Sequence, residues 1–75
     1  MSKNNFQDQL DKFFLFFGAE QSLSEPDVEK LQHIVRQTEA KTIDQAEKVC
    51  RYVVEQKMMD WPEDEIVDAI RKAEL

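Results

Sequence analysis

Two side chains with the chemistry of nucleophiles or metal ligands occur once each in this sequence, Cys50 and His33. A cysteine nucleophile needs a base beside it, and His33 is the only histidine that could serve. Helical periodicity places Cys50 on an apolar stripe and His33 on the polar side of its own predicted helix. We therefore predict a buried, unreactive thiol and a surface histidine. We expect no enzymatic activity, no cofactor and no metal site.

The segment from Asp60 to Asp68 holds five acidic residues and no basic residue. A calcium loop would alternate Asp or Asn ligands around a central glycine, and this segment lacks that pattern. Negative charge is favoured in the first turn of a helix. We interpret these acids as the solvated start of a helix, and a basic partner protein is the alternative.

The net charge of −6 and the single cysteine limit the class of protein. Phosphate backbones attract Lys and Arg, so an acidic chain is a poor general binder of nucleic acid. A single cysteine excludes an internal disulfide and fits a reducing compartment. The N-terminal residues lack the pattern of a secretion signal, and no apolar run approaches the roughly 20 residues of a membrane span. We expect a cytoplasmic protein with one domain over residues 1–75.

Apolar residues recur at helical spacing in four segments, and no useful length alternates with the period of two that is typical of strands. The predicted helices cover residues 5–17, 25–38, 43–58 and from 60 onward. The sequence therefore predicts an all-α fold, a compact bundle of four short helices. The boundary between the second and third helices contains neither glycine nor proline, so three helices follow if those two are continuous.

Local signals mark the ends of these predicted helices. Ser24 and Thr42 have the side chains of N-capping residues, and Gln45 completes a capping box with Thr42. Asp60 is predicted to open the fourth helix. Gly18 suits the left-handed residue that follows a helix end, so the first helix is predicted to stop before it.

All five phenylalanines lie in the first seventeen residues, and residues 13–17 form an unbroken apolar run. At about 100° per residue, three phenylalanines of this run continue an inward stripe, whereas Leu15 and Phe16 point away from it. Either neighbouring helices wrap around the first helix and bury both side chains, or both reach the surface and form an interface. We take Leu15 and Phe16 as candidate partner-binding residues, with this alternative left open.

A second set of apolar residues lies off the stripe of the third predicted helix. Tyr52 and Met59 are seven residues apart on its outer face, and Trp61 follows shortly after. Trp, Tyr and Met are favoured in interfaces. Either Trp61 folds back to make a small local cluster, or Tyr52, Met59 and Trp61 bind a partner together with Met58.

These features favour a small non-enzymatic protein–protein interaction module: an adaptor, an inhibitor or a regulatory subunit, or a homodimer formed through the first helix. No small-molecule substrate is evident. The alternative is a transcription-related protein that binds DNA through the third helix or mimics DNA with its acids. Asp44, Glu47 and Glu55 would face phosphates from that helix, which argues against direct DNA binding.

Overall fold

The computed structural model describes residues 5–75, and its side chains are described from Phe6 onward. The described chain forms four helices and no strand, which confirms the predicted all-α bundle of four short helices. The helices are α1 (Asn5–Glu20), α2 (Glu25–Gln37), α3 (Ile43–Glu55) and α4 (Glu63–Ala73).

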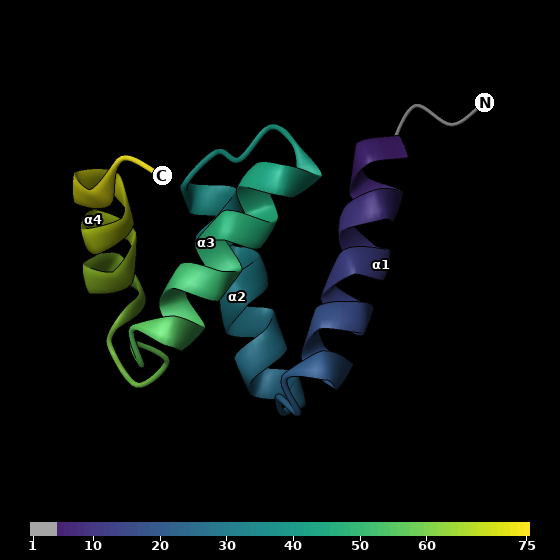
Figure 1. Ribbon diagram of the computed structural model, residues 1–75, viewed down its shortest axis with the longest axis horizontal. Helices are drawn as coiled ribbons and strands as arrows, with labels where there is room; N and C mark the ends of the chain where they lie inside the picture. Colours follow the sequence, from purple (N-terminus) through teal and green to yellow (C-terminus); the bar gives the residue numbers. More distant parts are fainter. Residues whose placement is uncertain (1–4) are drawn as a thin grey trace.

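The α2–α3 pair lies in the middle of the molecule, and α1 and α4 flank it on opposite sides (Figure 1). Each flanking helix packs against both α2 and α3, whereas α1 and α4 make no contact in the described part of the chain. The result is a flattened shape with principal extents of 37 × 26 × 16 Å. Because no other described helix lies beyond α1, one face of this helix is left uncovered by residues 5–75.

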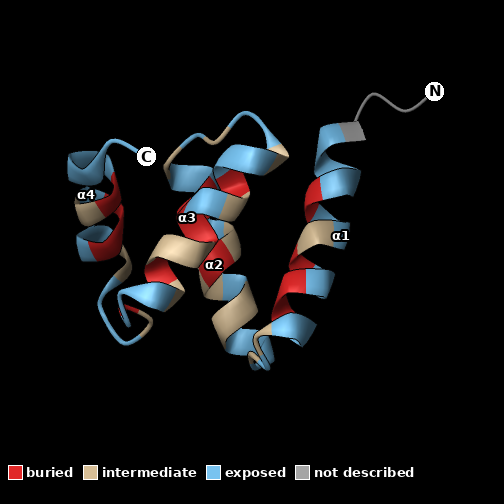
Figure 2. Ribbon diagram, in the orientation of Figure 1, coloured by how far each residue is buried: buried red, intermediate tan, exposed pale blue. Residues whose placement is uncertain are grey.

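The buried side chains face inward from all four helices and form one apolar core (Figure 2). From α1 the core takes Leu10, Phe14 and Phe17, as the predicted stripe requires. Burying an aliphatic or aromatic side chain of this size stabilises the fold by roughly 1.5–3 kcal/mol. No buried side-chain nitrogen or oxygen lacks a hydrogen-bond partner in the described residues.

The break predicted between the second and third helices is confirmed. The Thr42 hydroxyl accepts a hydrogen bond from the N–H of Gln45 at 3.1 Å, as an N-cap should. The Gln45 amide oxygen in turn accepts from the N–H of Lys41 at 2.7 Å. Together these bonds satisfy two donors that the start of α3 would otherwise leave unpaired.

After each of the four helices, a residue other than glycine adopts the left-handed conformation. These residues are Ser22, Glu39, Lys57 and Glu74, with φ of 57°, 58°, 58° and 57°. After α3, the N–H of Met58 donates to the carbonyl of Val53 (3.0 Å) and the N–H of Lys57 donates to that of Val54 (3.1 Å). This is the Schellman pattern. It ends α3 at Glu55, three residues before the predicted end.

The prediction that Gly18 ends the first helix is wrong. The helix continues to Glu20, and Gly18 lies inside it with no positive φ. A Cβ atom at Gly18 would lie 2.9 Å from Cγ2 of Val28 on α2. The glycine is therefore required for close approach of the two helices, and Ser22 takes the left-handed role.

The predicted starts of two helices need correction in detail. Ser24 is the N-cap residue of α2, but its side chain makes no capping hydrogen bond. Pro62, and not Asp60, precedes the first residue of α4. The fixed φ of proline suits this boundary. Asp60 instead lies in the loop between α3 and α4.

We expect Lys57→Gly to raise the free energy of unfolding by roughly 0.5–1 kcal/mol, because glycine adopts the left-handed conformation without the steric cost of a Cβ. Urea denaturation followed by circular dichroism measures the change. Lys48→Gly is the matched control, since Lys48 is exposed in the interior of α3. The control should lose roughly 1 kcal/mol. If both substitutions lowered the free energy of unfolding, the left-handed conformation assigned to Lys57 would be contradicted.

We expect Gly18→Ala to lower the free energy of unfolding by roughly 1 kcal/mol. Alanine in a helix gains roughly 0.5–1 kcal/mol over glycine, but overpacking typically costs 1–3 kcal/mol. In a Val28→Ala background, the same change should be neutral or stabilising because the clashing methyl group is gone. Chemical denaturation of the original protein, the two single variants and the double variant measures these changes. If Gly18→Ala lowered the free energy of unfolding equally in both backgrounds, the contact with Val28 would not be the cause.

Candidate protein-binding surface

Leu15 and Phe16 are the most exposed large apolar side chains on the described surface, at 77% and 76% of their full accessibility. Both lie on α1, on the side away from the core. The question that the sequence left open is thus answered for these two residues, since no neighbouring helix covers them. Exposed apolar patches of this kind usually mark sites of contact with another molecule.

The other aromatic residues of the run are engaged within the molecule. The ring of Phe13 stacks on Phe17 with centroids 5.5 Å apart and meets the edge of Phe14 at 5.3 Å. The guanidinium of Arg51, on α3, lies 5.6 Å from the centre of the Phe17 ring, which is within range of a cation–π interaction. Packing therefore accounts for these three residues and leaves Leu15 and Phe16 in excess.

The two exposed residues lie on different flanks of α1. Leu15 lines a groove of about 510 Å³ between α1 and α2. Glu20, one helical turn after Phe16, lies 3.7 Å from Arg51 of α3. Side chains four residues apart share a helix face, so Phe16 lies on the flank nearer α3.

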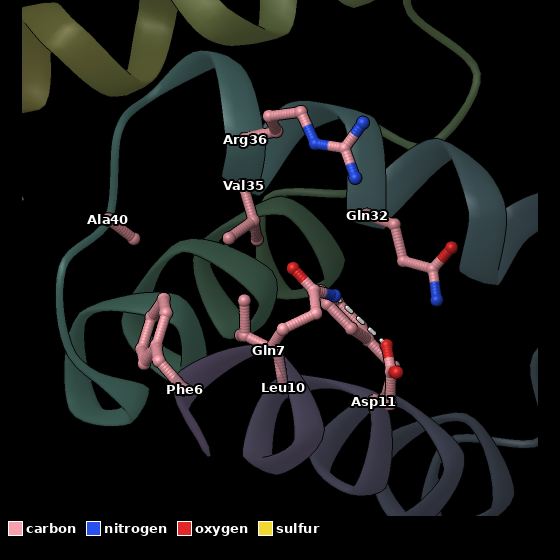
Figure 3. Close-up of a pocket in the computed structure, with 9 residues that line it drawn as sticks. Phe6, Gln7, Leu10, Asp11, Gln32, Val35, Arg36 and Ala40 are labelled. Atoms are coloured by element: carbon pink, nitrogen blue, oxygen red, sulfur yellow. Dashed lines mark hydrogen bonds between the residues drawn. The ribbon is translucent and has the colours of Figure 1, made fainter. Parts of the chain in front are cut away.

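The groove is lined by apolar and small residues from α1 and α2. Its lining includes Phe14, Leu15, Gly18, Ala19, Leu23 and Val28. A second hollow of about 280 Å³ adjoins it, shares Phe14 and Gln32 with it, and extends toward Phe6 and Ala40 (Figure 3). The two helices lie close at their connecting turn and diverge toward the start of α1 (Figure 1). Both hollows lie along the α1–α2 junction and share two lining residues, and we refer to the pair as the channel.

Most of the groove was missed by sequence reasoning. Periodicity identified Leu15 as surplus to the core, but it cannot say which neighbouring helix leaves a gap beside that residue. The signal that could have helped is the adjacent pair Gly18 and Ala19, since small residues on a helix allow close approach of another backbone.

The residues Tyr52, Met59 and Trp61 lie elsewhere. Tyr52 is on α3, and the other two lie in the loop that leads to α4. Tyr52 and Met59 are half-buried against the core, and Trp61 is 44% exposed. The ammonium group of Lys30, on α2, donates hydrogen bonds to the backbone carbonyls of both Met59 and Trp61. This loop is thus tied to α2, and Met58 before it is buried in the core.

The five predicted partner-binding residues do not form one continuous surface. Leu15 and Phe16 belong to α1 and Trp61 to the loop before α4, and these two helices flank the molecule on opposite sides (Figure 1). The described structure therefore offers two separate candidate surfaces. The α1 surface exposes the larger fraction of its apolar side chains.

Neither of the chemically reactive residues lines the hollows between α1 and α2. His33 is exposed on α2, and its Nδ1 lies 3.5 Å from Oε2 of Glu63. The other carboxylate oxygen of Glu63, Oε1, accepts a hydrogen bond from the side-chain amide of Gln37 at 3.0 Å. Cys50 is buried in the core. Burial raises the pKa of the Cys50 thiol to about 12, with a smaller opposing effect of Arg51. No group of three or more potential metal ligands occurs among residues 5–75.

Comparisons with protein families, with curated proteins and with solved structures find no match to this chain. Among the described helices, none is both long and apolar enough to cross a bilayer.

We expect the Cys50 thiol to react with iodoacetamide at pH 8 about a thousandfold more slowly in the folded protein than in urea. A pKa of about 12 lowers the thiolate fraction by about three orders of magnitude relative to an ordinary cysteine. Mass spectrometry of quenched samples gives the two rates. Comparable rates would contradict the buried, protonated thiol.

Proposed function

We propose that this chain is a non-enzymatic protein-interaction module that binds its partner through the outer face of α1. The observation that carries the proposal is the exposure of Leu15 and Phe16, at 77% and 76%, on a face of α1 that no other part of the described chain covers. Covering each of these side chains contributes roughly 1.5–3 kcal/mol, which offsets part of the entropic cost of association.

The charge of the chain favours a different protein as the partner over a second copy. Each copy carries a net charge of −6, so two copies would repel one another at long range. This argues for an adaptor, inhibitor or regulatory subunit ahead of the homodimer.

Binding of DNA through α3 is the weaker alternative. Arg51 donates to Glu47 at 2.8 Å and lies 3.7 Å from Glu20. Its positive charge is therefore shared with two carboxylates, which reduces what α3 could offer to a phosphate backbone.

Photocrosslinking in the source cells tests the proposal. The photoreactive amino acid p-benzoylphenylalanine replaces Leu15 or Phe16, and in the control it replaces Glu65, which is exposed on α4. We expect protein adducts at the two α1 positions and none at Glu65, because only α1 contacts the partner. An adduct of twice the chain mass identifies a homodimer, and sedimentation equilibrium of the purified protein then checks it. Adducts no more abundant at Leu15 and Phe16 than at Glu65 would overturn the proposal.

A further inference from the structure

We propose that the groove between α1 and α2 binds an amphipathic helix of another protein, with basic residues along one edge of that helix. This inference rests on the proposed function, because it names the partner of the same α1 surface. It is drawn from the shape of the groove, from the distribution of charge at its edges and from the charge of the whole chain.

The floor of the groove is apolar and continuous with the core. Phe14 is almost fully buried and still contributes to both hollows. Leu15 lines the α1 side and Val28 the α2 side. Grooves of this kind recognise a helix through its apolar residues at positions i, i+3 or i+4, and i+7.

The size of the channel suits a helix. Ala19 is exposed and carries only a methyl group, so a partner helix can approach the backbone of α1 closely at this point. Along α1 the two hollows run from Phe6 to the turn at Ser22. At 1.5 Å per residue this stretch is roughly 24 Å long, which is the length of about 16 helical residues.

The α2 edge of the groove is acidic. Glu25, Glu29 and Gln32 all line it, and their spacing of four and three residues places them in one row along α2. Neither glutamate forms an ion pair with any of residues 6–75. Lys or Arg side chains on a bound helix would therefore meet carboxylates that have no basic partner within the described chain.

The remaining charges of the channel, in its second hollow, are one acid and one base. Asp11 lines the second hollow from α1, where it accepts a hydrogen bond from Gln7 at 3.1 Å (Figure 3). Arg36 also lines the second hollow. The larger hollow, beside Leu15, has acidic residues at its edge and no basic residue among those that line it.

A second copy of the chain is a poor occupant. Its helices carry acids in their first turns, including three in α4, and its net charge is −6. Placed in the groove, such a helix would bring carboxylates toward Glu25 and Glu29. A basic helix from a different protein avoids this repulsion.

The test uses a fluorescein-labelled amphipathic peptide of about 16 residues, with leucine at the i, i+3, i+4, i+7 positions and lysine elsewhere. Fluorescence anisotropy at about 0.15 M salt measures its binding to the full chain. Two control peptides contain glutamate in place of lysine, or the same leucines and lysines in scrambled order. We expect the ordered Leu/Lys peptide to bind at least tenfold more tightly than either control. Equal binding of the scrambled peptide would mean simple attraction between charges and would overturn the inference.

Matched variants locate the binding site. Leu15→Ser should weaken binding roughly tenfold, because a leucine contact is worth at least about 1.5 kcal/mol. The same change at Leu75, a 47% exposed leucine at the end of the chain, should have no effect. The pair Glu25→Gln and Glu29→Gln should weaken binding roughly three- to tenfold. Asp64→Asn with Glu65→Gln changes the net charge equally on α4 and should have no effect. Equal losses in the test and control variants would overturn the inference.

This inference and the proposed function can fail separately. If the Leu/Lys peptide does not bind but Leu15 and Phe16 still crosslink to a protein in cells, the module stands and a basic helix is the wrong partner. If the peptide does not bind and the crosslinks are also absent, both are wrong.

Discussion

The close approach of α1 to α2 at Gly18 is the contact on which the rest of the structure depends. A Cβ at this position would meet Val28 at 2.9 Å, so the backbone of α1 lies as near to α2 as side chains allow. In this packing, Phe14 and Phe17 enter the core and Leu15 and Phe16 face outward.

The ends of the helices show how tertiary packing compensates for unfavourable local conformations. A left-handed residue other than glycine costs roughly 1–2 kcal/mol, and this chain accepts the cost at Ser22, Glu39, Lys57 and Glu74. After the first three an apolar residue follows and packs on the core (Leu23, Ala40 and Met58), whereas Leu75 after Glu74 is exposed. In the first three turns, burial of the apolar residue offsets the strain, most clearly for Met58, which is almost inaccessible. These three turns are therefore specified by the apolar residue after them and not by glycine.

This explains which features the sequence could predict. The all-α fold and the inward stripes follow from periodicity, and the break before α3 follows from the Thr42–Gln45 capping pair, because these signals are local. The predicted end at Gly18 failed because the residue serves a contact with Val28, which lies ten positions away in the chain. The end of α3 was missed because Lys57 gives no local sign of a left-handed residue. Periodicity also separated Leu15 and Phe16 from the core stripe, but only the packing of α1 on α2 shows the groove beside Leu15.

The flattened arrangement connects the fold to its proposed function. In a chain of 75 residues, four short helices can bury one stripe each, and a helix at the edge of the bundle keeps its opposite face exposed. Here α1 has apolar side chains on that face, and they lie on two flanks, with Leu15 toward α2 and Phe16 toward α3. A helix bound in the α1–α2 groove covers Leu15. It contacts Phe16 only if it also extends across α1 to the flank that faces α3. The affinity of such a partner would therefore depend mainly on Leu15. The acidic residues of α2 would favour a partner helix that has basic residues along one edge.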